Sequence, residues 1–140
     1  MSELVLSFLE KPTELQKRQI LCIYHRQGWW PESITDPDRV QRVISGSHCF
    51  LVVSSENDIV GFGRALSDRT GDAYIHDVTV REDFRRLGIG SRIVSTLVAR
   101  LKEDGITWIA LIAENSSQAF YKNLDFTAME KAQPMFRWLI

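Results

Sequence analysis

The sequence is poor in the features that mark several large protein classes. It has two cysteines, Cys22 and Cys49, and four prolines in 140 residues. A small secreted domain usually needs more disulfides than two cysteines can form, so we expect a reducing, cytoplasmic setting. The first ten residues lack a basic segment followed by a long apolar run, so no secretory leader is expected. The longest apolar run, near residues 106–113, is too short to cross a bilayer, so no membrane partner is expected.

Strong charge of one sign is also missing. The chain has 17 Lys and Arg against 18 Asp and Glu, a formal net charge of −1. Domains that bind nucleic acid usually carry a clear basic excess, so no nucleic-acid partner is expected. The two cysteines do not have the spacing of metal ligands, and no metal is expected. The length suits one domain that spans residues 1–140.

The pattern of apolar residues predicts strands that alternate with helices. Thr13 and Gln16 have the spacing of a helix capping box, and residues 55–58 have the chemistry of a hairpin turn. The run 108–113 is continuously apolar, so we expect a strand buried on both faces. The predicted order is β-α-α-β-β-β-α-β-α-β-β, an α/β fold with a central mixed sheet and helices on both faces. Its strands are expected at 4–9, 49–53, 59–66, 73–80, 108–113, 126–129 and 135–140.

A basic turn with two glycines, residues 85–90 (R-R-L-G-I-G), joins the strand-like run 73–80 to a helix-like run over 89–103. Free N–H groups at a helix start favour an anion, and glycine lets backbone approach a ligand closely. The dinucleotide fingerprint G-x-G-x-x-G fails because its third glycine is missing, and the P-loop fails because Gly90 precedes Ser-Arg. The turn therefore predicts a pyrophosphate site, the alternative being a basic turn that only starts a helix.

The remaining pattern, R-x-x-G-x-G, resembles the acyl-CoA-binding signature of the GNAT N-acetyltransferase superfamily. The predicted element order and Phe120-Tyr121 on the following helix extend this resemblance over essentially the whole chain. The resemblance implies direct transfer of an acetyl group from acetyl-CoA, the expected cofactor, to a primary amine. It implies that the turn and a strand edge hold CoA through Val78, Thr79, Val80, Arg85, Arg86, Leu87, Gly88, Ile89, Gly90 and Ser91. Val78 and Val80 can also be core residues, because only their main-chain groups are needed for binding.

The resemblance also implies that Tyr121 is the general acid beside the cofactor sulfur. A phenol with a pKa of about 10 can donate to a thiolate whose thiol has a pKa near about 8.5. The alternative is a tyrosine packed on a helix face. Two positions depart from the family pattern: Asp125 replaces a common glycine in a position where aspartate tolerates a left-handed turn, and Glu114 replaces a common cofactor-contacting asparagine.

The base for the amine is expected at His76 or Asp77, where a polyamine-acetylating branch of the family has Glu-Asp. Side chains alternate along a strand, so the two are expected on opposite faces and at most one faces the acceptor. A neutral histidine with a pKa of about 6.5 suits the task. The alternatives are a half-buried histidine bonded to backbone and an aspartate that orients a loop or a water.

The acceptor is expected beside Trp29 and Trp30, in the loop that lines the acceptor side in the family. Aromatic rings attract cationic amines, although the pair can also simply pack over the sheet edge. A small-molecule amine is favoured over a protein lysine or N-terminus. The alternative from another class is a catalytically silent acyl-CoA-binding or regulatory module. The apolar segment 135–140, if it forms an exposed edge, predicts a homodimer.

Overall fold

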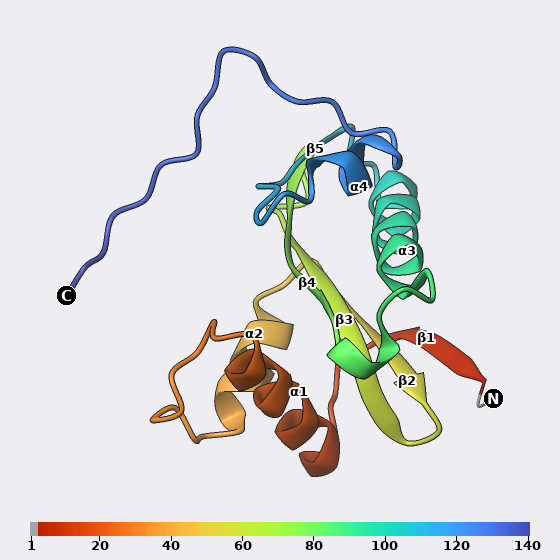
Figure 1. Ribbon diagram of the computed structural model, residues 1–140, viewed down its shortest axis with the longest axis vertical. Coiled ribbons are helices and arrows are strands. Elements are labelled where there is room, and N and C mark those ends of the chain that lie inside the picture. Colours follow the sequence, from red (N-terminus) through yellow and green to blue (C-terminus); the bar gives the residue numbers. More distant parts are fainter. Residues whose placement is uncertain (1–2) are drawn as a thin grey trace.

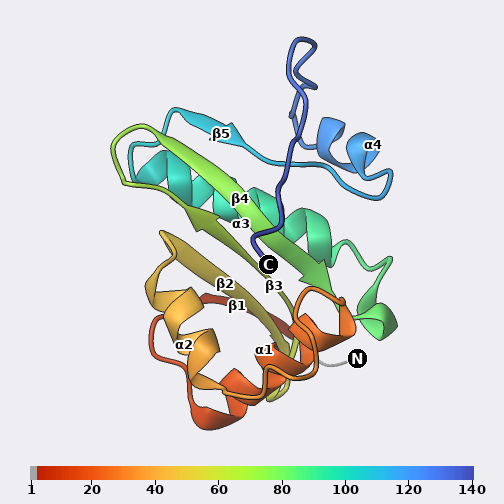
Figure 2. The ribbon, with the colours of Figure 1, turned by 90° about the vertical axis from the view of Figure 1, so that its left-hand side faces the viewer.

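The computed structural model describes residues 3–140, in which a five-stranded sheet lies between two helical layers (Figures 1 and 2). The strands lie in the order β1-β2-β3-β4-β5, and only β4 and β5 run parallel. The mixed α/β sheet predicted from the sequence is therefore confirmed. The elements are β1 (Leu4–Phe8), α1 (Glu14–Arg26), α2 (Asp38–Ser45), β2 (Cys49–Ser55), β3 (Asp58–Leu66), β4 (Asp72–Val80), the 3-10 turn η1 (Glu82–Phe84), α3 (Ile89–Glu103), β5 (Trp108–Ala110) and α4 (Gln118–Lys122).

The central strands face two separate apolar cores. On β2, Phe50 and Val52 pack with residues of α1 and α2, whereas Leu51 and Val53 pack with residues of α3. Successive side chains of a strand point to opposite faces, so a strand covered on both sides is apolar throughout. Gly63 of β3 brings α3 close to the sheet, since a Cβ there would lie 2.8 Å from Cγ2 of Ile93.

Two local expectations are confirmed. Thr13 Oγ1 accepts a 3.1 Å hydrogen bond from the N–H of Gln16, whose Oε1 accepts one of 2.9 Å from the N–H of Thr13. This is the reciprocal capping box that fixes where α1 begins. The hairpin between β2 and β3 also forms, and Ser55 pairs with Asp58 across its turn.

A bulge interrupts β4 in the middle of the sheet. Phe62 pairs with Thr79, but Arg64 pairs with His76, so the strand has one extra residue opposite β3. Asp77 lies at this bulge and has a left-handed backbone conformation, with φ of 57°. A bulge breaks the alternation of side chains, and here it re-aims the side chain of Asp77.

The strand β5 pairs with β4 over three residues only, Asp72 to Tyr74 on the β4 side. Beyond Tyr74, β4 continues to Val80 with no strand on that side within residues 3–140. Figure 2 shows the two strands diverging, with α4 beyond the end of β5. The divergence leaves an open strand edge in the middle of the molecule.

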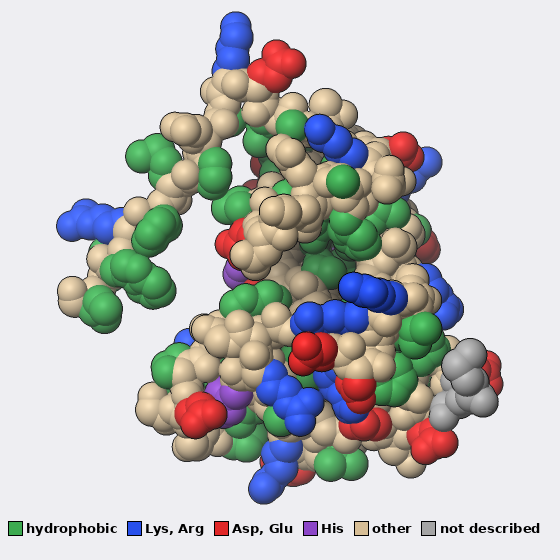
Figure 3. Space-filling model, viewed as in Figure 1, with side chains coloured by type: hydrophobic (Ala, Val, Ile, Leu, Met, Phe, Trp, Pro, Cys, Tyr) green, Lys and Arg blue, Asp and Glu red, His purple; other side chains and the backbone are tan. Residues whose placement is uncertain are grey.

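The two last predicted strands are wrong. Residues 126–129 and 135–140 form no strand, and the segment after α4 runs away from the sheet (Figure 1). Its apolar side chains stand apart from the body in Figure 3, with exposed fractions of 76% for Trp138 and 89% for Met135. A strand needs a neighbour to pair its N–H and C=O groups, and this segment has none.

The expectation that residues 108–113 form a strand buried on both faces is also wrong. The strand β5 ends at Ala110, and Trp108 and Ile112 are 54% and 46% exposed, so this strand is not buried on both faces. It is the edge of the sheet, because the last predicted strands do not return to cover it. No helix within residues 3–140 has both the length and the apolar character needed to cross a membrane.

Candidate active site

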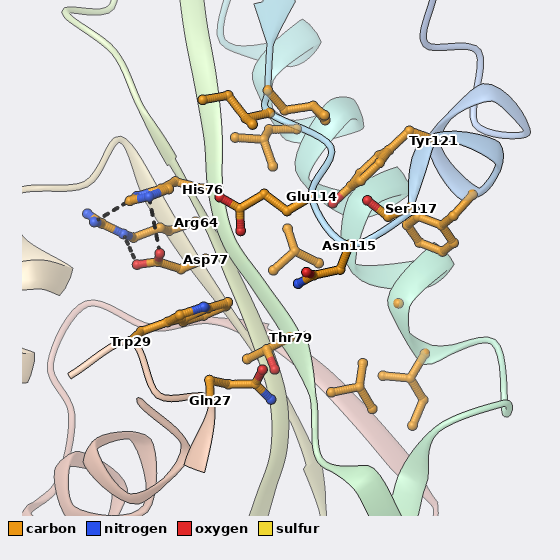
Figure 4. Close-up of a pocket in the computed structure, with 18 of the residues that line it drawn as sticks. Gln27, Trp29, Arg64, His76, Asp77, Thr79, Glu114, Asn115, Ser117 and Tyr121 are labelled. Atoms are coloured by element: carbon orange, nitrogen blue, oxygen red, sulfur yellow. Dashed lines mark hydrogen bonds and ion pairs between the residues drawn. The ribbon is translucent and has the colours of Figure 1, made fainter. Parts of the chain in front are cut away.

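A pocket of about 1070 Å³ opens where β4 and β5 diverge (Figure 4). Its walls come from the end of α1 with the loop after it, from β4, from the turn before α3, and from the segment between β5 and α4. Every residue predicted to hold the cofactor lines it except Leu87, which is 55% exposed outside. The predicted residues Trp29, Trp30, His76, Asp77 and Tyr121 line it as well.

One end of the pocket has the groups that suit an anion. The cap residue of α3 is Gly88, which has φ of 77° and no side chain to satisfy the first N–H groups of the helix. The first turn of α3 contains no acidic residue, and Arg85 and Arg86 precede it. Unsatisfied N–H groups, the helix dipole and nearby guanidinium groups fit a diphosphate.

Gly90 keeps this end open. A Cβ at Gly90 would lie 3.4 Å from Cζ of Phe120 on α4, inside the space between the two helices. Next to it, Nε of Arg85 donates a 2.9 Å hydrogen bond to the carbonyl oxygen of Val80, at the end of the open β4 edge. The residues present therefore fit a long ligand with a diphosphate at one end. Residues 3–140 hold no group of three or more His, Cys, Asp or Glu side chains suited to a metal ion.

Tyr121 lines the pocket from α4, on the wall opposite the β4 residues His76 and Asp77. Its ring packs edge-on against Phe120 and Phe126, with centroids 4.9 Å and 5.7 Å away. Burial, followed by the proximity of Tyr74, raises the pKa of the Tyr121 hydroxyl above its ordinary value. The hydroxyl therefore keeps its proton at neutral pH and can donate it. Asp125, with φ of 68°, forms the left-handed turn that the sequence predicts after α4.

His76 and Asp77 lie in one cluster, so the expectation of opposite faces is wrong. The bulge at Asp77 brings its Oδ1 to 3.3 Å from Nε2 of His76. Arg64 of β3 joins both: its Nε donates to Oδ2 of Asp77 at 2.9 Å, and its Nη2 donates to Nδ1 of His76 at 3.1 Å. Figure 4 shows these three side chains linked on one wall of the pocket.

Tyr24 closes this cluster from α1. Its hydroxyl donates a 2.6 Å hydrogen bond to Oδ2 of Asp77, and burial, reinforced by that carboxylate, raises the pKa of Tyr24. The side chain of Asp77 is 11% exposed and that of His76 is 44% exposed, so His76 reaches solvent more freely. Sequence reasoning missed Tyr24 and Arg64. The register of the β3–β4 hairpin, which pairs Arg64 with His76, would have found Arg64.

The two tryptophans have different surroundings. Trp30 stacks on Tyr24, with centroids 3.9 Å apart and planes 7° apart, and the guanidinium of Arg39 lies 4.7 Å from the centroid of Trp30. Trp29 meets Tyr24 edge-on at 6.0 Å and is 39% exposed. Trp30 is thus a partly buried ring packed against the core, whereas Trp29 offers more of its ring to the pocket.

Comparison with known proteins adds a family to this geometry. Residues 14–126 match the model of the acetyltransferase (GNAT) family. An uncharacterized N-acetyltransferase, ycf52, of Porphyra purpurea is 36% identical over 89 residues, which cover 59% of this chain and 51% of that protein. Serotonin N-acetyltransferase 2, chloroplastic, of Oryza sativa subsp. japonica is 32% identical over 93 residues, which cover 64% of this chain and 46% of that protein. The chain thus spans about half the length of the curated relatives it matches.

A solved structure shares the fold over nearly the whole chain. Glucosamine-6-phosphate N-acetyltransferase from Arabidopsis thaliana superposes with a TM-score of 0.79, covering 99% of both chains at 21% identity.

Proposed function

Because the chain belongs to the acetyltransferase (GNAT) family, we propose that it transfers an acetyl group from acetyl-CoA to the primary amine of a small molecule, with residues 1–140 acting as one catalytic domain. One observation carries this proposal. A single pocket joins an anion-receiving helix start, at Gly88 and Gly90, to a protonated phenol at Tyr121 and a polar cluster around Asp77.

Acetyl-CoA supplies a thioester whose C–S bond is replaced by a C–N bond to the amine. The N–H groups at the start of α3, with Arg85 and Arg86, bind its diphosphate. The open edge of β4, Val78 to Val80, lies between that turn and the cluster, so its main-chain groups can orient the arm that carries the acetyl group. These residues act by holding the thioester in a fixed position relative to the amine.

Tyr121 provides the proton that the leaving sulfur needs. Its hydroxyl lines the pocket and has no hydrogen-bond acceptor among residues 3–140, so its proton is available. The raised pKa keeps the group protonated across the neutral range, as a general acid requires. The packing of the ring against Phe120 and Phe126 fixes the direction of the hydroxyl.

The amine is proposed to enter beside Trp29 and His76. The exposed part of the Trp29 ring can contact an aromatic or cationic group, and the cluster of Arg64, His76 and Asp77 forms the polar wall opposite Tyr121. The sequence predicts that at most one of His76 and Asp77 faces the acceptor, whereas both line this pocket. A protein acceptor and a silent acyl-CoA-binding module are the alternatives that the experiment below separates.

The experiment starts with thermal unfolding in parallel with acetyl-CoA, CoA and NAD. A ligand at about one hundred times its dissociation constant adds about 2.7 kcal/mol of stability. We expect both CoA species to raise the melting temperature and NAD to leave it unchanged. CoA thiol release is then followed with small primary amines and with lysine peptides. Release with small amines supports the proposal, release with peptides only indicates a protein acceptor, and binding without release indicates the silent module.

The location and the assembly of the protein are proposed from two further features. Both cysteines are free thiols, which fits a reducing compartment such as the cytoplasm, although the rice relative is chloroplastic by name. The open edge at β5 and the exposed apolar residues of 135–140 fit a homodimer in which the segment of one copy pairs with the edge of the other.

A further inference from the structure

Resting on the proposed function, we propose that Glu114 is the residue that receives the acceptor amine. Its carboxylate binds the amine as an ammonium ion and then takes one proton from it. The acceptors are therefore small primary amines that arrive as cations. This assignment moves the proton-accepting role away from His76 and Asp77, where the sequence pattern put it.

The position of Glu114 supports this role. It lies in the segment between β5 and α4 and lines the pocket. The two residues after it, Asn115 and Ser116, have φ of 52° and 62°, so the chain turns sharply there before α4 begins. Figure 4 shows the Glu114 side chain reaching into the pocket from that segment, between Tyr121 and His76.

The acceptor atoms of the neighbouring candidates are already in use. Oδ2 of Asp77 accepts hydrogen bonds from Tyr24 and Arg64, and its Oδ1 lies 3.3 Å from Nε2 of His76. The side chain of Asp77 is only 11% exposed. Nδ1 of His76 accepts from Nη2 of Arg64, and arginine cannot be the acceptor in such a bond. A neutral imidazole has one lone pair, so this contact leaves His76 without a free site for a proton.

Glu114 has no such engagement. Within residues 3–140, its carboxylate makes no hydrogen bond and no ion pair, although it lines the same pocket. Six titratable or charged side chains face this part of the pocket: Tyr24 from α1, Arg64 from β3, Tyr74, His76 and Asp77 from β4, and Tyr121 from α4. The single cation among them, Arg64, is neutralised by Asp77 at 2.9 Å. Glu114 is thus the charged side chain at this end of the pocket that has no oppositely charged partner within residues 3–140.

The two ends of the pocket therefore favour ligands of opposite charge. Arg85 and Arg86 stand at the helix start, where a diphosphate fits, and neither forms an ion pair with Glu114. Glu114 also lies close enough to Tyr74 for its carboxylate, after burial, to raise the pKa of that phenol. A cationic amine is attracted to the Glu114 end and an anion to the other.

The proton balance is simple. A primary ammonium ion cannot attack a carbonyl carbon, because its nitrogen has no lone pair. One proton moves from this nitrogen to a carboxylate oxygen of Glu114, which becomes a neutral carboxylic acid and leaves a neutral amine. The second proton that nitrogen loses on forming the amide goes to solvent, and the sulfur receives its own from Tyr121. Solvent then returns a proton to Tyr121 and takes one from Glu114, so each turnover releases one proton in all.

The first test is binding without any acetyl donor, so that catalysis is not needed. Calorimetry compares 2-phenylethylamine with its uncharged analogue 2-phenylethanol at pH 7. We expect wild-type protein to bind the amine at least tenfold more tightly, and Glu114→Gln to lose this preference. Glu103→Gln, a matched charge removal at the end of α3 outside the pocket, should keep it. A preference absent from the wild type, or kept by Glu114→Gln, would overturn the proposal.

The second test is the pH profile of CoA release between pH 6 and 8. Without a base, only neutral amine reacts, and its fraction rises about tenfold per pH unit below an amine pKa of about 10. We expect kcat/KM of Glu114→Gln to follow that slope and the wild type to be nearly flat. His76→Gln should lower kcat/KM but keep the flat profile. A flat profile for Glu114→Gln together with a steep profile for His76→Gln would overturn the role of Glu114. Absence of CoA release by the wild type with any amine would instead overturn the proposed function.

Discussion

The hydroxyl of Tyr24 donates a 2.6 Å hydrogen bond to Oδ2 of Asp77, and this bond connects the core of α1 to the wall of the pocket. The Tyr24 side chain is buried and its ring stacks on Trp30, so its position is set by packing. Asp77 lies in the β4 bulge, 53 residues further along the chain. The geometry of the pocket therefore depends on how α1 packs against the sheet.

Replacing Tyr24 with phenylalanine should destabilise the protein. The substitution keeps the ring but leaves a nearly buried carboxylate with one donor fewer, a loss of about 1 to 3 kcal/mol for hydrogen bonds of this kind. Urea unfolding monitored by circular dichroism measures the change. Tyr74→Phe is the matched control, because the Tyr74 hydroxyl has no hydrogen bond within residues 3–140. Equal stabilities of the two variants would contradict the structural role of the bond.

Tyr121→Phe should lower turnover by about tenfold or more, since it removes the proposed acid and keeps the ring packing. The dissociation constant of acetyl-CoA, measured by calorimetry, should change little. An acid acts only while protonated, and burial raises the pKa of Tyr121, so the wild type should not lose activity through this group as pH rises to about 10. Unchanged turnover would exclude Tyr121 as the acid.

Gly90→Val should weaken acetyl-CoA binding at least tenfold, because a Cβ there already approaches Phe120 at 3.4 Å and fills the space before α3. Gly88→Val should also weaken binding, and it should cost about 1 to 2 kcal/mol of stability because φ is 77°. Gly71→Val is the control, since a Cβ there meets nothing within 4 Å. Calorimetric affinity equal to wild type in Gly90→Val would remove the turn from the site.

A second buried cluster makes stability depend on pH. The buried His48 ring contacts Ser67 through Nδ1 and lies 2.8 Å from Asp104 through Nε2. The hydrogen bond from His48, followed by that from Arg100, lowers the pKa of Asp104 below its ordinary value. A carboxyl with a lowered folded pKa adds stability above its unfolded value of about 3.9, and this stability is lost as pH falls through the folded value.

Asp104→Asn should therefore be less stable than wild type at pH 6, and the difference should shrink as pH falls below 4. Urea unfolding at pH steps from 6 to 2.5 measures it, with Glu103→Gln as a neighbouring charge control. A difference that stays constant over this range would mean that Asp104 does not contribute through its ionised form.

The apolar segment 135–140 should drive association. Trp138 and Leu139 are 76% and 83% exposed, which favours their burial against a second copy. Light scattering at micromolar concentration should give the mass of a dimer, and Leu139→Asp should shift it toward the monomer. Lys131→Asp, a charge change shortly before this segment, is the control. A monomeric mass for the wild type would reject the dimer.

Much of the fold could be predicted because the relevant signals are local. The capping box at Thr13 and the glycine turn at Gly88 depend on residues a few positions apart, and the structure has both. The one strand predicted to be buried on both faces, at residues 108–113, lies instead at the edge of the sheet. The last two strands failed, because a strand pattern predicts an extended chain but not a partner for it. Nothing local in 135–140 indicates that the segment leaves the sheet.

The sequence by itself determined the glycine turn before α3, the order of the first nine elements from the strand at residues 4–9 to the helix after β5, and the residues of a family signature, because each depends on neighbours in the chain. Only the tertiary structure decided which groups of the pocket are free to react. The bulge at Asp77 placed His76 and Asp77 on one wall, where Arg64 and Tyr24 occupy their acceptor atoms. The free carboxylate is that of Glu114, on the other wall. Hydrogen bonds between segments far apart in the sequence occupy acceptor lone pairs. A local sequence pattern therefore does not predict which acceptor atoms stay free.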